Sequence, residues 1–237
     1  MRIKTKLIII FIFLLVSGTY YLHEFNYPEI VYTEIDPNLV DIKFFSKDEN
    51  GNHFRNIGSL KNHLNNTLIF AMNGGIFKED LNPLGLYIES GKMETAINLK
   101  SGYGNFYMNP NGVFYLTKNK KANIVPSSTF TYDETIEYAT QSGPMLIINK
   151  KIHKGFHQDS KNYHIRNGVC ILDSGKLIFA ISKNKINLYQ FAKFFEDREC
   201  LNALYLDGFV SKAFIPEKNL EELEGDFSII IAAIKEK

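Results

Sequence analysis

Short runs of apolar, β-branched and aromatic residues, each ended by turn residues, divide the chain from Pro28 onward. Runs of this length and composition are typical of β-strands. Turns rich in Asn, Asp, Gly and Pro separate them, and the turn at 173–176 joins two apolar runs as a β-hairpin does. The predicted strands are 30–35, 40–45, 68–72, 85–88, 105–108, 113–117, 145–148, 169–172, 177–181, 203–206 and 228–234. A chain with this pattern must fold around β-sheet.

Helical periodicity is clear in one segment. Asn187 can cap a helix whose apolar face is formed by residues at helical spacing, Leu188, Phe191, Ala192 and Phe195. Residues 59–64 are a weaker second helix, and the strand–helix–strand order across 177–206 permits one crossover. We predict an α+β fold: a single domain over residues 28–237 with a largely antiparallel or mixed sheet and few helices.

The first 22 residues have the pattern of an export signal. Arg2, Lys4 and Lys6 precede the apolar run LIIIFIFLLV, and small residues follow it. This run is shorter than the roughly 20 residues that span a bilayer, although continuing to Leu22 lengthens it enough for an uncleaved anchor. We predict a signal peptide or N-terminal membrane anchor at 1–22 and a periplasmic or extracellular domain. Contact with the membrane is expected through this segment alone.

The charge balance limits the partners of the domain. Without Arg2, Lys4 and Lys6, 24 basic residues face 26 acidic ones, a formal charge of −2. A near-neutral domain argues against nucleic-acid binding and against long-range capture of an anionic substrate. Recognition of phosphate must therefore be local.

The cysteines and histidines do not form a recognisable metal site. Two cysteines cannot make a four-thiolate zinc site, and we expect Cys170 and Cys200 to be buried thiols, although an oxidising compartment permits a bond. His153, His157 and His164 have no standard ligand spacing, so a solvated loop is expected. No G-x-S-x-G, H-E-x-x-H, P-loop or G-x-G-x-x-G motif occurs. Neither a metal nor a cofactor is predicted.

Four apolar strands run directly into polar and glycine residues. The segments are Asn73-Gly74-Gly75, Gln141-Ser142-Gly143, Arg166-Asn167 and Asp207-Gly208. Glycine lets backbone N–H groups turn toward a ligand, amide and hydroxyl side chains suit sugar hydroxyls, and arginine suits phosphate. Each segment taken alone is more simply explained as an ordinary β-turn than as part of a binding site. Together, the four complementary strand ends are expected to converge at one edge of a sheet.

The same segments lie within longer motifs. They are FAMNGGIF at 70–77, GLYIESGK at 85–92, NFYMNPNGVFYL at 105–116, YATQSGPMLIINKKIH at 138–153, IRNGV at 165–169 and NALYLDG at 202–208. In this order, across 31–234, the chain resembles the phosphodiester glycosidase domain family. It departs from the family pattern at Cys170, where glycine would continue RNGV, and at Phe209, where a small residue usually follows LDG.

The resemblance implies hydrolysis of a sugar-1-phosphodiester to free sugar and a phosphomonoester. Because phosphate is a better leaving group than a sugar alkoxide, positive charge can replace the usual general acid. We predict that Arg166 clamps the phosphate together with the amides of Gly74 and Gly75. Asp207 is predicted to act as base or nucleophile at the anomeric carbon, and Asn73 to orient the sugar or Asp207. The predicted sugar site also contains Gln141, Ser142, Gly143, Asn167 and Gly208.

Two other functions compete with this one. The same groups suit a non-catalytic, membrane-tethered module that binds anionic cell-surface glycans. A metal-dependent phosphodiesterase is the least favoured, because no acidic or histidine cluster has convincing ligand spacing. For the hydrolase and for the binding module, the expected partner is a glycan or a sugar phosphodiester.

Overall fold

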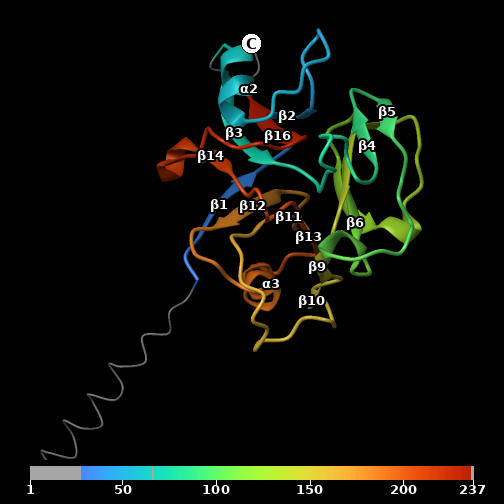
Figure 1. Cartoon of the computed structure of the whole chain (residues 1–237), viewed down its shortest axis with the longest axis vertical. Helices are drawn as coiled ribbons and strands as arrows, with labels where there is room; N and C mark the ends of the chain where they lie inside the picture. Colours follow the sequence, from blue (N-terminus) through green and yellow to red (C-terminus); the bar gives the residue numbers. More distant parts are fainter. Residues whose placement is uncertain (1–27, 66, 236–237) are drawn as a thin grey trace, which may run out of the picture.

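The computed structural model describes residues 28–65 and 67–235 (Figure 1). The predicted export segment 1–22 lies outside the described residues. Within the described ranges, no helix has both the length and the apolar character needed to cross a bilayer.

The described strands form three sheets. One has six strands in the order β1-β12-β11-β13-β9-β10, and two have five, in the orders β15-β14-β3-β16-β2 and β5-β4-β8-β6-β7. All pairs among these strands are antiparallel, which confirms the predicted β-rich fold with few helices. The strands are β1 (Ile30–Ile35), β2 (Asp41–Phe45), β3 (Leu68–Asn73), β4 (Tyr87–Glu89), β5 (Lys92–Thr95), β6 (Gly112–Thr117), β7 (Ala122–Pro126), β8 (Ile136–Ser142), β9 (Met145–Ile148), β10 (Lys151–Ile152), β11 (Asn167–Ile171), β12 (Leu177–Ser182), β13 (Asn202–Tyr205), β14 (Ala213–Ile215), β15 (Leu220–Glu221) and β16 (Ile230–Ile234).

Each sheet turns one face toward a shared central core. The side-chain period of two is plain in β12, where Phe179 belongs to the central core and its neighbours Ile178 and Ala180 belong to the opposite face. One aromatic ring from each sheet meets at the centre. The Phe179 ring lies 4.6 Å from that of Phe70 and 6.0 Å from that of Phe114, centroid to centroid.

Two helices cover the outer faces of two sheets (Figure 1). The helix α3 (Leu188–Glu196) packs Phe191 and Phe195 against the six-stranded sheet, and α2 (Ile57–His63) packs Leu60 against the sheet that contains β3. Strands that are buried on both faces are apolar at nearly every position, which explains the continuous apolar runs in the sequence.

The predicted helix cap at Asn187 and the crossover are confirmed. Asn187 accepts a hydrogen bond from Gln190 N, and the Gln190 side chain accepts from Asn187 N, which completes a capping box at the start of α3. Because β12 and β13 both pair antiparallel with β11, they run parallel to each other, and α3 connects them across it.

The predicted strand at 105–108 is wrong. Residues Asn105–Tyr107 form the short 3-10 helix η1. Alternation of polar and aromatic residues resembles a strand, but this segment pairs with no strand of the described ranges 28–65 and 67–235. Instead, Phe106 is buried, and the Tyr107 ring packs on Gly102.

Cys170 and Cys200 form a disulfide, contrary to the expected thiols, with Cα atoms 6.0 Å apart. Cys170 lies in β11, and Cys200 lies in the segment between α3 and β13, the strand that pairs with β11, so the contact is not visible in the flanking sequence. Closing a loop of this size stabilises the fold by about 3.5 kcal/mol. Structural disulfides are typical of proteins that work in oxidising compartments.

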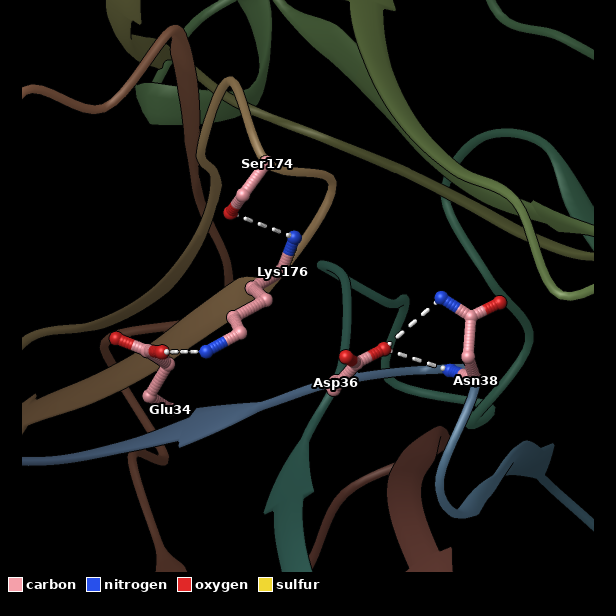
Figure 2. Close-up of polar contacts among 5 residues, drawn as sticks. All are labelled: Glu34, Asp36, Asn38, Ser174 and Lys176. Atoms are coloured by element: carbon pink, nitrogen blue, oxygen red, sulfur yellow. Dashed lines mark hydrogen bonds and ion pairs between the residues drawn. The ribbon is translucent and has the colours of Figure 1, made fainter.

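One end of the six-stranded sheet is held by exposed polar contacts, and we call it the turn end (Figure 2). Lys176 Nζ donates to Glu34 Oε1 at 2.9 Å, and both side chains are 44% exposed. Asn38 donates from its backbone and side chain to Asp36 Oδ1, and Lys176 N donates to Ser174 Oγ. The candidate site lies at the other end of these strands.

Candidate active site

The four predicted strand ends come from all three sheets, not from one sheet edge as expected. Asn73 ends β3, Ser142 ends β8, Asn167 begins β11, and Asp207 follows β13. Nearly all of the predicted polar side chains are buried there. The packing of the sheets around one core, which local sequence does not specify, brings these ends together.

Asn73, Asn167 and Ser211 form a buried hydrogen-bonded cluster that we call the asparagine junction. Asn73 Nδ2 donates to Asp207 O at 2.9 Å, and Asn73 Oδ1 accepts from Asn167 Nδ2 at 2.9 Å and from Lys212 N at 2.9 Å. Ser211 Oγ donates to Asn167 Oδ1 at 3.2 Å. The cluster therefore joins β3, β11 and the 207–212 loop, and it holds the backbone at Asp207.

Asp207 is the carboxylate with the most unusual environment in this region. Its N–H donates to Gly74 O at 3.1 Å, and its side chain is only 9% exposed. Burial raises the pKa of Asp207 to about 6, while the Phe209 N–H, which donates to Oδ1 at 3.1 Å, works in the opposite direction. Its other carboxylate oxygen accepts no hydrogen bond from the described part of the chain. Such a group can accept or donate a proton near neutral pH.

Arg166 is wholly buried and is held by protein groups. Its Nε donates to Ile186 O at 3.0 Å, its Nη1 to Tyr205 Oη at 3.1 Å, and its Nη2 to Asn162 O at 2.7 Å. Burial lowers the pKa of Arg166, because these partners are neutral and desolvation disfavours the cation. The predicted phosphate clamp stays a prediction, and in this arrangement the guanidinium supports Tyr205.

Tyr205, which Arg166 holds in place, packs against Gly208, the residue after Asp207. A Cβ atom on Gly208 would lie 1.7 Å from Tyr205 Oη, so only glycine fits there. Burial raises the pKa of the Tyr205 hydroxyl, which stays neutral and able to donate. The chain of contacts from Arg166 through Tyr205 to Gly208 thus shapes the loop that presents Asp207.

The backbone N–H groups of Gly74 and Gly75, both predicted to bind phosphate, differ in whether the protein already uses them. Gly74 N donates to Ile229 O at 2.7 Å, so it is engaged within the fold. Gly75 N donates no hydrogen bond to any described residue and is free to bind a ligand. A Cβ on Gly75 would lie 2.5 Å from Thr140 Oγ1, which makes this close contact with β8 specific to glycine.

Gln141 is buried and fully engaged. Its Oε1 accepts from Leu86 N at 3.0 Å and from Asn98 N at 2.9 Å. Its Nε2 donates to Asn98 O at 2.8 Å and to Ser127 Oγ at 3.1 Å. Gln141 therefore fixes the 97–98 backbone, and its predicted contact with sugar stays a prediction.

The neighbours of Gln141 on this strand end are buried as well. The Ser142 hydroxyl has no hydrogen-bond partner in the described ranges. Gly143 packs against Asn111 and precedes the cis-proline Pro144. The structure thus brings Gln141, Ser142 and Gly143 next to the 97–111 loops, on the β8 side of Gly75.

The histidine loop is only partly solvated. His157 and His164 are exposed, but His153 is buried, with Nε2 donating to Asn109 O at 2.8 Å and Nδ1 accepting from Gly155 N at 3.0 Å. In the described ranges, no three His, Cys, Asp or Glu residues are grouped closely enough to hold a metal ion.

Sequence reasoning missed Ser211, Tyr205 and Asn98 as parts of the site. Tyr205 belongs to the NALYLDG motif, so its place beside Asp207 was a signal that could have been used. Ser211 and Asn98 have no such signal, because their roles depend on contacts with Asn167 and Gln141 that are far away in sequence.

Comparison with known proteins supports the relationship that the motifs indicate. The family model for phosphodiester glycosidases matches residues 66–228. YigE of Escherichia coli (strain K12), an uncharacterised protein, is 38% identical over 186 residues, which cover 76% of this chain and 72% of YigE.

Two solved structures share the fold. The zebrafish N-acetylglucosamine-1-phosphodiester alpha-N-acetylglucosaminidase catalytic domain, auto-inhibited by its pro-peptide, aligns with a TM-score of 0.61 at 16% identity, over 90% of this chain and 85% of that one. A Burkholderia pseudomallei K96243 protein hypothesised to be exported aligns with a TM-score of 0.57 at 8% identity, over 87% and 74% of the two chains.

Proposed function

Because the chain belongs to the phosphodiester glycosidase family, we propose that it is an exported hydrolase that removes a sugar from a sugar-1-phosphodiester. The products are a free sugar and a phosphomonoester. The zebrafish structure of the same fold is that of an enzyme named for this bond type, which supports the proposed substrate class.

The environment of Asp207 is the single observation that carries the proposal. A carboxylate that is nearly buried, with its pKa raised to about 6 and one oxygen without a protein partner, suits proton transfer or attack at an anomeric carbon. The asparagine junction holds its backbone, so the geometry is set before substrate binds.

The reaction breaks the bond between the anomeric carbon and the phosphate oxygen. The bonding electrons leave with the phosphate, and water supplies the hydroxyl group that completes the free sugar. Asp207 acts either as the base that takes the proton from water or as a nucleophile whose glycosyl ester water then hydrolyses. The Gly75 N–H is the backbone donor we assign to the developing phosphate charge.

Asn73 and Arg166 act as positioning residues in this proposal. Asn73 binds the carbonyl of Asp207, and Arg166 holds Tyr205 against Gly208, so each orients the loop without a direct contact with the reacting atoms. Loss of either is expected to misplace Asp207, and small displacements of a reacting group cost large factors in rate.

Export is the proposed location. The basic and apolar pattern of residues 1–22 and the disulfide between Cys170 and Cys200 both support work outside the cytoplasm.

The direct test is incubation of the purified protein with sugar-1-phosphodiesters, followed by separate assays for free sugar and phosphomonoester. We expect both products in equal amounts from the wild-type protein and neither from Asp207→Asn. Cleavage on the phosphorus side, which would release a sugar phosphate instead of free sugar, contradicts the proposal.

A binding module without turnover is the second candidate. One observation favours it: Phe209, which departs from the family pattern next to Asp207, is 88% exposed and can offer a stacking face to a sugar. The same incubation decides between the two, because the module predicts that the phosphodiester binds and is recovered intact.

A further inference from the structure

A groove runs along the loops that Gln141 supports, and we call it the 97–111 groove. It consists of a cleft of about 690 Å³ and a second of about 470 Å³, which share Leu99 and Lys100 in their walls. Asn109 and Ser128 line it with exposed polar side chains suited to sugar hydroxyls, and Asn98 and Asn111 form part of its floor.

The charge along this groove has one sign. Lys78 and Lys100 line it, and no carboxylate does. In the part of the chain that the structure describes, neither lysine forms a salt bridge. Two other clefts differ: the one beside β2 pairs lysines with Asp41 and Glu137, and the one beside β1 contains Glu34, Asp36 and Glu217. The 97–111 groove therefore attracts an anion, the cleft beside β1 repels one, and in the cleft beside β2 the opposite charges offset each other.

The floor of the groove is rigid. Gln141 holds both the N–H and the carbonyl of Asn98, while Asn98 Nδ2 donates to Leu84 O at 3.0 Å and its Oδ1 accepts from Lys100 N at 3.1 Å. Farther along, Asn111 Nδ2 donates to Phe106 O at 2.9 Å. A surface whose backbone is fixed in this way loses little conformational entropy when a ligand binds.

The floor of the groove is linked to the Asp207 loop through buried protein contacts. Asp207 N donates to Gly74 O at 3.1 Å, the next residue Gly75 packs against Gln141, and Gln141 binds Asn98 in the groove floor. The groove and the Asp207 loop are therefore held in a fixed relation to each other by Gln141.

We propose that the 97–111 groove binds the phosphate-bearing half of the substrate, an anionic glycan, through Lys78 and Lys100. The Arg166 guanidinium is engaged by Ile186, Tyr205 and Asn162, so the cations for the phosphate must come from another place, and these two lysines supply them. Tyr107, which lines the larger cleft, presents an aromatic face on which a sugar ring can stack. The inference rests on the proposed function and names the residues that select its substrate.

The test compares two double variants of the full chain. The groove variant, Lys78→Gln with Lys100→Gln, removes two positive charges from the groove. The control variant, Lys118→Gln with Lys121→Gln, removes two positive charges from the turn that follows β6, outside the groove. Binding of glucose 6-phosphate, with glucose as the uncharged probe, is measured by calorimetry, and KM and kcat are measured on a sugar-1-phosphodiester. Equal melting temperatures of both variants and wild type establish that the fold is retained.

We expect the groove variant to bind glucose 6-phosphate about tenfold more weakly and to raise KM about tenfold at unchanged kcat. Glucose binding and the control variant should match wild type. Equal losses in both double variants, or none in the groove variant, overturn the inference even if wild type turns over. If no phosphodiester is cleaved but the binding pattern holds, the proposed hydrolysis fails and the groove is still a phosphoglycan site.

Discussion

The two ends of the six-stranded sheet carry the same kinds of polar residue in opposite settings. At the turn end, Asp36, Asn38 and Lys176 make exposed contacts, and two of these link residues only two positions apart (Figure 2). At the asparagine junction, Asn73 contacts residues 94 and 134 positions away in the sequence, and the contacts are buried.

Burial, not residue type, decides what a polar strand end does. An exposed hydrogen bond or ion pair replaces similar contacts with water and contributes little. A buried one cannot be replaced by water, so its loss leaves unsatisfied groups, and a carboxylate placed there acquires a shifted pKa. Substitutions at the two ends should therefore differ in both stability and activity.

The largest effect is expected from Asp207→Asn. Asparagine keeps the Oδ1 that accepts from Phe209 N but cannot act as base or nucleophile, so turnover should fall by about 10²–10⁴. The matched control is Asp36→Asn at the turn end, where turnover should be unchanged. Near-normal turnover of a folded Asp207→Asn protein would contradict the assigned role.

Asn73→Ala should strongly destabilise the fold. It removes three side-chain hydrogen bonds, leaves Lys212 N and Asp207 O without their Asn73 side-chain partner and leaves Asn167 Nδ2 with only its bond to Asn73 O, at a cost of about 3–4 kcal/mol in the free energy of unfolding. Urea unfolding measures this value. A loss no greater than that of Asn38→Ala at the turn end would mean that the junction does not hold the site.

Asp207 should also make stability depend on pH. Its pKa of about 6 in the folded protein lies above the ordinary value of 3.8, so the folded state binds its proton more tightly than the unfolded chain. The free energy of unfolding should therefore fall by about 2 kcal/mol as the pH rises from 4 to 8, with most of the fall below pH 6.

Asp207→Asn removes this fall, because asparagine does not titrate, and it should be more stable than wild type at pH 8. Denaturant unfolding of both proteins at pH 4 and pH 8 measures the difference. Identical pH dependence in wild type and variant would show that Asp207 is not perturbed by burial.

Arg166→Lys tests positioning against phosphate clamping. Lysine cannot reach Ile186 O, Asn162 O and Tyr205 Oη together, so we expect a loss of about 2 kcal/mol in stability. As a positioning residue, Arg166 should affect kcat more than the affinity for phosphomonoester product. A selective loss of product affinity at unchanged stability would support the clamp instead.

The smallest effect is expected from Lys176→Gln. Its ion pair with Glu34 is exposed on both sides, so the free energy of unfolding should change by less than about 0.5 kcal/mol. A loss comparable with that of Asn73→Ala would remove the distinction between the two ends.

Much of the fold could be predicted from the sequence because its signals are local. Most predicted strands appear within one or two residues of their expected bounds, and Asn187 caps α3 as predicted. The strand predicted at 105–108 failed because β-propensity says nothing about whether a neighbouring strand is available. The short edge strands β5, β10 and β15 carry too little apolar pattern to be recognised.

The structure gathers the predicted polar strand ends in one region, but their contacts could be predicted from the sequence only in part. Residues such as Asn73, Gln141 and Arg166 were expected to meet a ligand, and in the structure their polar atoms bind other parts of the chain. Side-chain type and spacing indicate that a group can form hydrogen bonds, not with which partner. Lys78 and Lys100 gave no signal at all, because lysines on loops are common.

The sequence by itself determined the β-rich class, the helix caps, the polar strand ends and the family, since each depends on neighbouring residues or on ordered motifs. Only the tertiary structure decided that three sheets share one core, that Cys170 pairs with Cys200, and that Arg166 is engaged while Asp207 keeps an open oxygen. The reason is physical: burial and long-range pairing change the pKa and the hydrogen-bonding capacity of a group, and both arise only when distant segments pack together.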